Sequence, residues 1–82
     1  MEKPKRVKVY WWDITTLSGW KTKYETEEAE ADFCVLEGLL VEKNKQFIKV
    51  APCWKEDLKG DEIYADVYVI PRGCIKEIKT YD

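Results

Sequence analysis

The chain has 82 residues, 45% of them hydrophobic, which predicts one compact domain spanning residues 1–82 and leaves too little for two. Fourteen basic residues against 16 acidic ones give a net charge of −2, and this balance argues against a non-specific DNA coat, which needs a strongly basic face. The sequence has no histidine, so it lacks the commonest general base and the commonest metal ligand.

The first predicted element is a strand over residues 5–12 that ends near Asp13. Polar and apolar residues alternate along it, and its aromatic residues favour strands. The alternation divides the side chains between two faces, with Val7, Val9 and Trp11 on one and Lys8, Tyr10 and Trp12 on the other.

After turn-forming residues at 15–19, the segment from residue 19 to residue 32 is predicted to be a long solvated loop. Its second half carries five carboxylates and no basic residue, namely Glu25, Glu27, Glu28, Glu30 and Asp32. Apolar residues do not recur there at spacings of three and four, so no amphipathic helix is expected. At most, one short helical turn forms over residues 26–31.

Two apolar runs, residues 33–42 and 46–52, predict a β-hairpin around a short polar turn that contains Asn44. Gly38 lies inside the first of these strands, which suggests a bulge, a bend or close packing against an aromatic ring. Pro52 ends the second strand because proline cannot donate a hydrogen bond to a ladder.

A fourth strand over residues 63–70 shows the clearest alternation in the chain. The residues expected to face inward are Ile63, Ala65, Val67 and Val69, and those expected to face outward are Tyr64, Asp66, Tyr68 and Ile70. Pro71 stops this strand, a turn follows at residues 72–73, and residues 74–79 predict a fifth, short strand.

These elements predict an all-β fold of five strands with no helix long enough to cover a sheet. So small a sheet protects its edges best by curling into a barrel, because closure removes unpaired edges. The expected core of this small five-stranded barrel consists of Val7, Val9, Ile48, Val50, Val67, Val69 and Ile75.

The end of the chain resembles a Src-homology-three-like barrel, in which a strand ending in proline leads through a one-turn reversal to a last short strand. The resemblance implies a single 3-10 turn after Pro71, and the long first loop and the central hairpin follow the same order. Glu27 and Glu28 match the acidic loop of the peptide-binding members, but no paired Trp can be placed at the start of the third strand. Binding of Pro-rich ligands is therefore not carried over.

A second resemblance, to small uncharacterised phage and prophage proteins, covers nearly the whole chain. The shared pieces are an aromatic–x–Asp, a Ser-Gly-Trp, a Cys-led strand containing Gly, and an ending like VIPRGCI. In this chain they are Trp11 and Asp13, residues 18–20, Cys34 and Gly38, and residues 66–75. The resemblance implies a phage or prophage accessory protein and implies no mechanism.

No residue pattern indicates catalysis, a cofactor or a metal. Without histidine, the single serine, Ser18, lacks its usual activating base, and the paired carboxylates lie in polar runs typical of a solvated surface. The three cysteines are far apart and outside any CxxC pair: Cys34, Cys53 and Cys74. We expect them to be reduced and mostly buried, with a disulfide or a metal site as the alternative. We therefore expect a protein that is not an enzyme and has no cofactor or small-molecule substrate.

The outward aromatic side chains are the candidate surface for a protein partner or for a second copy of the chain: Tyr10, Trp12, Tyr64 and Tyr68. Exposed Trp and Tyr are enriched at protein interfaces, where an apolar ring and a polar edge are both useful. The four rings form one patch or two. The alternative is ordinary ring packing over the sheet, or burial beneath the long loop through Trp20 and Tyr24.

Basic residues near the N-terminus are the second candidate surface. Lys5, Arg6 and Lys8 lie close to two of these rings, and basic groups beside exposed rings form the platform of single-strand nucleic-acid binders. The alternative is that the basic side chains keep an edge strand from pairing with another sheet. Because the net charge is negative, we place nucleic acid second to protein as the expected partner.

No run approaches the roughly 18 apolar residues of a membrane span, and the basic N-terminus lacks the apolar segment of a secretory signal. We expect a cytoplasmic protein, neither secreted nor membrane-bound, in the host cytoplasm if a phage encodes it. The expected function is that of an accessory protein that binds a protein or self-assembles. Nucleic-acid binding and a structural role in the virion are the alternatives.

Overall fold

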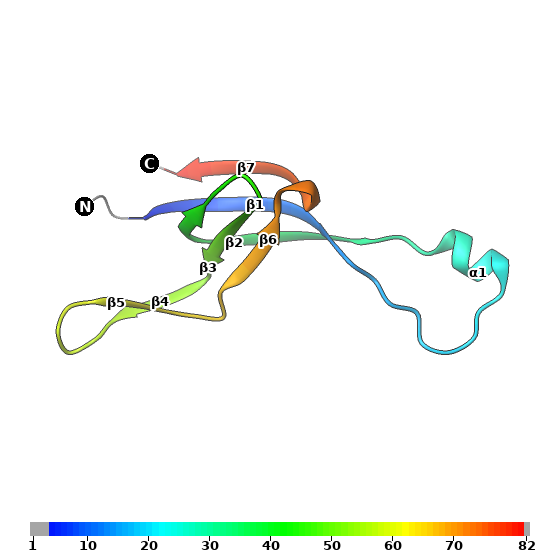
Figure 1. The fold of residues 1–82 in the computed structure, drawn as a ribbon, viewed down its shortest axis with the longest axis horizontal. Helices are drawn as coiled ribbons and strands as arrows, with labels where there is room; N and C mark the ends of the chain where they lie inside the picture. The colour runs from blue at the N-terminus through cyan, green and yellow to red at the C-terminus, as the bar shows by residue number, and fades with distance from the viewer. Residues whose placement is uncertain (1–3, 82) are drawn as a thin grey trace.

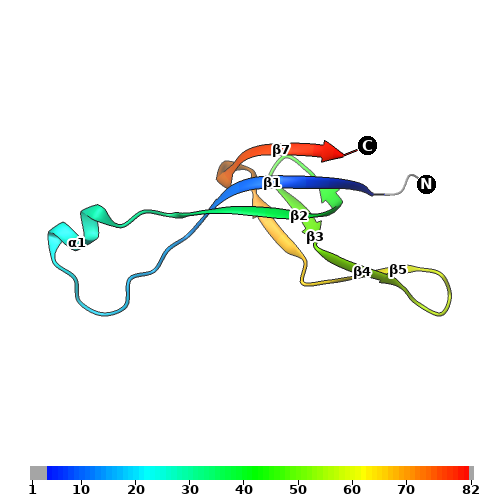
Figure 2. The same ribbon diagram turned by 180° about the vertical axis from the view of Figure 1, so that it is seen from behind.

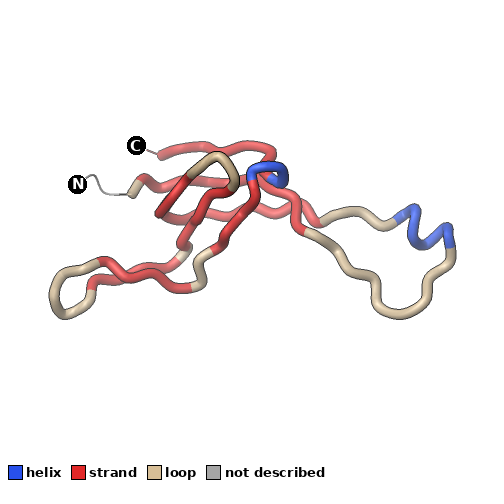
Figure 3. Tube along the Cα trace, viewed as in Figure 1, coloured by secondary structure: helices blue, strands red, loops and turns tan. Residues whose placement is uncertain are grey.

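A computed structural model of the chain describes residues 4–81, and Figure 1 shows its elements in chain order. They are β1 (Lys5–Asp13), α1 (Lys23–Glu28), β2 (Asp32–Lys43), β3 (Phe47–Ala51), β4 (Cys53–Glu56), β5 (Glu62–Ala65), β6 (Tyr68–Pro71), the 3-10 helix η1 (Arg72–Cys74) and β7 (Ile75–Tyr81). Strands make up most of these elements, as Figure 3 shows in red.

Five of the strands form one antiparallel sheet in the order β6-β3-β2-β1-β7, and β4 pairs with β5 in a separate hairpin. This architecture confirms the prediction of a mostly-β protein built on a five-stranded antiparallel sheet. The outer strands of the sheet are β6 and β7, and they do not pair with each other within residues 4–81. The sheet is therefore open, and the closed barrel expected from the sequence is not seen.

The molecule is elongated, with dimensions of 55 × 25 × 19 Å. Its radius of gyration is 16.5 Å, whereas a compact chain of this length has a value of about 12 Å. Two segments extend from the sheet in opposite directions (Figures 1 and 2), namely residues 14–31, called the arm from here on, and the β4–β5 hairpin. The compact shape predicted from the length is therefore wrong.

The core lies along the inner face of the sheet, where five side chains are almost completely buried: Val7 and Val9 of β1, Ile48 and Val50 of β3, and Ile70 of β6. The four on β1 and β3 were predicted from the sequence. Ile75, also predicted to be buried, is half-buried and packs against the margin of this cluster. The two faces assigned to the first strand are thus confirmed.

The predicted burial of Val67 and Val69 is wrong, because these side chains are 42% and 56% exposed. The continuous fourth strand breaks at Asp66, whose φ of 57° lies in the left-handed region. As a result, β5 pairs with β4 while β6 pairs with β3. Ile70 then lies opposite the buried Ile48, so the even-numbered side chains of β6 face the core.

Gly38 is required by a close approach of the backbone rather than by an aromatic ring. A Cβ atom at this position would clash with the carbonyl oxygen of Ala51 and would lie 2.9 Å from the Cα of Pro52. The chain passes over Gly38 at this point as it leaves β3 for β4. The absence of a side chain on β2 therefore sets the path of the β4–β5 hairpin.

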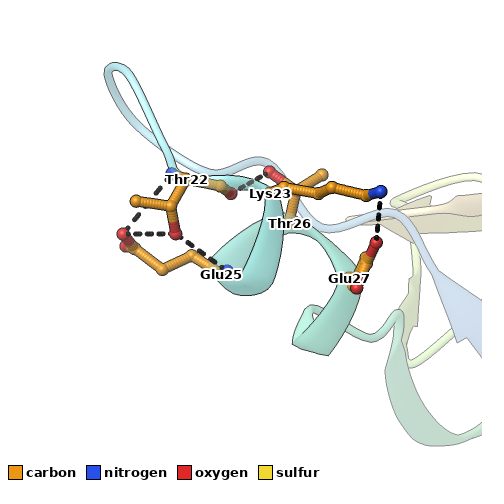
Figure 4. A network of polar contacts seen from close by, with 5 residues as sticks. All are labelled: Thr22, Lys23, Glu25, Thr26 and Glu27. Carbon is orange, nitrogen blue, oxygen red and sulfur yellow. Dashed lines mark hydrogen bonds and ion pairs between the residues drawn. The ribbon is translucent and has the colours of Figure 1, made fainter.

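The helical turn in the arm begins three residues earlier than the turn expected at residues 26–31. Thr22 is the reason, because its hydroxyl accepts a hydrogen bond of 3.1 Å from the N–H of Glu25 while the Glu25 carboxylate accepts one from the N–H of Thr22 (Figure 4). This reciprocal capping fixes the start of α1.

Within residues 4–81, no helix is long and apolar enough to cross a membrane.

The 3-10 helix η1 follows Pro71, where the resemblance to Src-homology-three-like barrels places such a turn. Arg72 ties η1 to the turn between β2 and β3. Its backbone N–H donates to the carbonyl of Gln46 at 2.9 Å, and its Nε donates to the carbonyl of Asn44 at 2.9 Å. These bonds hold the chain at the point where it crosses from one outer strand of the sheet to the other.

Ile70→Val should lower the free energy of unfolding by about 0.5–1.5 kcal/mol, because it removes a buried carbon from the core. Val69→Ala, on the opposite face of the same strand, should change it by less than about 0.5 kcal/mol. Chemical denaturation of the two variants measures both values. A larger loss for Val69→Ala would contradict the assignment of the faces of β6.

Gly38→Ala should lower the free energy of unfolding by about 1–3 kcal/mol, because the added methyl group forces the backbone at the end of β3 to move. Gly73→Ala is the matched control, since nothing lies within 4 Å of its Cβ position. Thermal unfolding should show a midpoint lowered by several degrees for the first variant and almost unchanged for the second. Equal midpoints would mean that the chain does not pass closely over Gly38.

Candidate functional site

A cluster of aromatic rings and lysines lies on the outer face of the sheet, opposite the core. We call it the aromatic–basic face, and its members are Lys8, Tyr10 and Trp12 of β1, Phe33 of β2, and Lys76 and Lys79 of β7. Directly opposite residues of an antiparallel pair share a face of the sheet. The register places Trp12 opposite Phe33 and Lys8 opposite Lys79, which brings three strands together at this surface.

Phe33 is the centre of the aromatic part of this face. Its ring stacks on that of Tyr10 with 6.2 Å between centroids and 17° between planes, and it meets Trp12 at 4.8 Å and 56°. Trp12 and Phe33 are 45% and 46% exposed. The three rings therefore form a continuous apolar patch that solvent reaches.

Lysine ammonium groups surround these rings. The Nζ atoms of Lys8 and Lys79 lie 5.6 and 5.4 Å from the centroid of the Tyr10 ring, and that of Lys76 lies 5.4 Å from the centroid of Phe33. Each such cation–π contact contributes about 0.5–1 kcal/mol at an exposed site. Lys8 and Lys79 are like charges directly opposite each other, which is unfavourable without a ring or an anion between them.

Lys8 remains protonated on this face at neutral pH. Tyr10 is the main cause that raises the pKa of Lys8 above its ordinary value, followed by Tyr81 and by Glu37. The Lys8 Nζ lies 3.7 Å from Oε1 of Glu37 across the β1–β2 pair. Because a lysine with a raised pKa holds its proton more firmly, the positive charge persists over the neutral range.

The structure brings together two of the four aromatic residues predicted to bind a partner. Tyr10 and Trp12 lie on the outer face, as predicted, and both contact the same ring. Tyr68 is on the inner face instead, opposite the buried Val50, where its ring meets that of Trp11 edge-on at 6.1 Å and 71°. The predicted face of Tyr68 is wrong because the break before β6 shifts the alternation by one residue, although its side chain is exposed, as predicted, at 42%.

Tyr64, the fourth predicted ring, lies away from the sheet in the β4–β5 hairpin, opposite Trp54. Its hydroxyl donates a hydrogen bond of 2.7 Å to Oε1 of Glu62, and this bond raises the pKa of Tyr64. The two rings line a shallow hollow of about 300 Å³ together with Cys53 and Ile63. Tyr64 therefore belongs to a separate surface from the aromatic–basic face.

The three predicted basic residues divide between the two sides of the sheet. Arg6 and Lys8 lie on the outer side, and the Arg6 guanidinium is 5.8 Å from the centroid of the Tyr81 ring. Lys5 lies opposite Leu40, whose side chain packs against the core on the inner side. Only two of the three therefore stand beside the exposed rings.

Three residues of this face, Phe33, Lys76 and Lys79, are not predicted from the sequence. For Lys76 the sequence contains one signal, the spacing of three residues between Ile75 and Ile78. Both isoleucines pack against the core, whereas side chains on one face of a regular strand recur every two residues. The irregularity is a bulge in the β1–β7 pair that allows Lys76 to point to the outer face. Phe33 had no such signal, because only the register of β2 on β1 places it beside Trp12.

The arm contributes a second unusual surface. Every residue from 14 to 31 is exposed, with Ile14 at 83%, Tyr24 at 71% and Trp20 fully exposed. The alternative in which Trp20 and Tyr24 bury the rings of the sheet is therefore wrong, because the arm extends away from the sheet (Figure 1). The chain thus displays apolar side chains that contact no core.

The three cysteines are free thiols, of which Cys34 and Cys74 are half-buried and Cys53 is exposed. The predicted burial is wrong for Cys53, because the fourth predicted strand is broken and β4 lies outside the main sheet. Within residues 4–81, no three or more Cys, Asp or Glu side chains are placed to hold a metal ion.

No protein family, curated protein or solved structure gives a significant match to this chain. The two surfaces described above are therefore the candidates for a functional role. One of these is apolar and basic, and the other is apolar and, over residues 25–32, acidic.

Cys53 should react with a thiol reagent faster than the two other cysteines, because its side chain alone is exposed. Stopped-flow labelling of the folded protein with a chromogenic disulfide should show one fast phase and two slower ones. Cys53→Ser should remove the fast phase only. Three equal rates, or a fast phase that persists in this variant, would contradict the assigned position of β4.

Proposed function

We propose that this chain is a non-enzymatic protein-binding or self-assembling module of a phage or prophage, and that the aromatic–basic face is its binding surface. The observation that carries the proposal is the contact of Tyr10, Trp12 and Phe33 on an outer sheet face that solvent reaches. An apolar patch with a polar rim is the usual composition of a protein interface.

The arrangement of the rings favours tight binding of a partner. Trp and Tyr are the residue types most often found to dominate binding energy. Here Trp12 and Tyr10 are held on a paired strand and against Phe33, so little side-chain entropy is lost when a partner covers them. The lysines at the rim select a partner whose contacting segment carries carboxylates.

The strand order and η1 support the finer proposal that the fold is Src-homology-three-like. In that arrangement, β1, β2, β3, β6 and β7 correspond to the five consecutive strands, and the β4–β5 hairpin extends the connection before the fourth. The phage or prophage origin is supported by the order and spacing of the sequence pieces that end in residues 66–75. We place the protein in the host cytoplasm, with a structural role in the virion as the alternative.

Binding of single-stranded nucleic acid is the second candidate, because cationic side chains and exposed rings share one face. Arg6 adds a fourth cation at the edge of the aromatic–basic face, beside Tyr81. Stacking of bases on such rings contributes about 1–3 kcal/mol per base. The net charge of −2 and the carboxylates of residues 25–32 oppose this candidate.

The double change Trp12→Ala and Lys79→Glu removes a central ring and reverses a charge of the aromatic–basic face. It should abolish self-association of the chain. It should also abolish binding of any protein partner that the wild-type chain captures from a phage-infected host. Leu58→Ala with Lys59→Glu is the matched control, because Leu58 is fully exposed in the loop of the β4–β5 hairpin, outside the aromatic–basic face. Sedimentation velocity reports self-association, and affinity capture with mass spectrometry reports a partner. If the face variant keeps every association of wild type, the face is not the binding surface.

Titration with a labelled single-stranded oligonucleotide separates the two candidate functions. Phosphate contacts produce a log-linear fall of affinity with salt. We expect no saturable binding at physiological ionic strength. Saturable binding that falls log-linearly with salt and is lost with Lys79→Glu would favour the nucleic-acid function instead.

A further inference from the structure

One chain carries two surfaces of complementary chemistry, and they extend in different directions. We propose that the protein bound by the aromatic–basic face is a second copy of this chain, whose arm docks on it. The inference rests on the proposed function, since it requires that the face bind protein. The occupant of the face is a second copy of the chain, and the segment that makes the contact is its arm.

The arm has the apolar content of an interface and lacks any cover of its own. Trp20 is fully exposed and Tyr24 is 71% exposed, although both are rings of the kind that normally fill a core. Ile14 and Leu17 are exposed on the same segment at 83% and 40%. Covering the two rings alone would bury about 300–500 Å² of the arm.

The tip of the arm is pre-formed by polar contacts within itself, as Figure 4 shows. Beyond the capping of α1 by Thr22, the hydroxyl of Thr26 donates to the Thr22 carbonyl at 2.9 Å, and Lys23 lies 3.7 Å from Glu27. No α1 side chain is buried. A helix of six residues is unstable without such contacts, so the capping lowers the entropy lost when the arm docks.

The charges of the two surfaces are complementary. The arm carries four carboxylates, Glu25, Glu27, Glu28 and Glu30, against two lysines, Lys21 and Lys23, so its charge is net negative. On the face, Glu37 partly neutralises Lys8 and Glu77 lies opposite Tyr10, whereas Lys76 and Lys79 have no carboxylate within ion-pair distance among residues 4–81. An acidic arm that carries exposed rings therefore matches a basic face that carries exposed rings, in both charge and apolar character.

The exposed area supports the same conclusion. The chain has 6899 Å² of accessible surface, whereas a compact protein of its mass exposes about 5,100 Å². The excess is comparable to the roughly 1,600 Å² buried in total by a protein–protein interface of standard size. In an assembly that covers each arm, the accessible surface area of each chain would be close to that of a compact protein of the same mass.

The contact between copies is head-to-tail, because the arm and the face are different surfaces. The arm connects the end of β1 to the start of β2, next to the Trp12–Phe33 pair. It extends away from the sheet in both views (Figures 1 and 2). Such a contact forms a ring if the rotation between copies closes and a filament if it does not. Each copy then contributes one arm and one face to the assembly.

Two complementary variants test this arrangement in the full chain. Trp20→Ala impairs the arm and leaves the face intact, and Lys79→Glu impairs the face and leaves the arm intact. Each variant alone should self-associate about 10- to 100-fold more weakly than wild type, because each removes a central contact. An equimolar mixture should form a 1:1 heterodimer and nothing larger, since only one functional contact remains.

Matched controls exclude a general loss of surface apolarity or charge. Leu58→Ala removes an equally exposed apolar side chain from the β4–β5 hairpin, and Lys59→Glu makes the same charge change there. Both should assemble as wild type does, as measured by sedimentation velocity over a concentration series. Assembly that these controls weaken as much as Trp20→Ala would overturn the role of the arm.

The remaining outcomes separate this inference from the proposed function. A wild-type chain that stays monomeric, with no heterodimer in the mixture, overturns docking of a second copy. If Lys79→Glu then still loses a captured protein, the face binds a different protein and the proposed function stands. If instead a single-stranded oligonucleotide binds the monomer and Lys79→Glu abolishes this binding, nucleic acid occupies the face and both proposals are wrong.

Discussion

The central strand β1 is the element on which both the core and the proposed binding face depend. It pairs with β2 on one side and with β7 on the other, so its alternating side chains are held on both faces of the sheet. Val7 and Val9 are completely buried on the inner face, whereas Lys8 and Tyr10 lie on the outer one. A slip of one residue in register would exchange these two sets, and would place two charged or polar side chains in the core.

The core is too small to accommodate the apolar content of the chain. Hydrophobic residues make up 45% of the sequence, yet only seven are buried among the described residues. The surplus is displayed on the aromatic–basic face, on the arm and on the β4–β5 hairpin. Because exposed apolar area on this scale is unfavourable in water, the shape of the isolated chain supports our proposal that a partner covers part of it.

The close approach at Gly38 and the turn at Asp66 together explain why the hairpin leaves the sheet. Gly38 permits the backbone of Ala51 and Pro52 to cross β2, and Asp66 turns the chain back toward β6. The glycine was recognisable from the sequence because it interrupts an otherwise apolar strand. Asp66 was not, since a non-glycine residue with positive φ sits within perfect alternation and gives no compositional signal.

The sequence by itself determined four of the five strands of the sheet, β1, β2, β3 and β7, and the two faces of β1, because a period of two is a local property of neighbouring residues. It also determined what the arm is made of, since the carboxylates and rings are adjacent in the chain. Only the tertiary structure decided that Phe33, Lys76 and Lys79 join Tyr10 and Trp12, and that the arm lies uncovered. These features depend on strand register, on a bulge and on the path of the backbone, which are set by hydrogen bonds and contacts between residues distant in sequence.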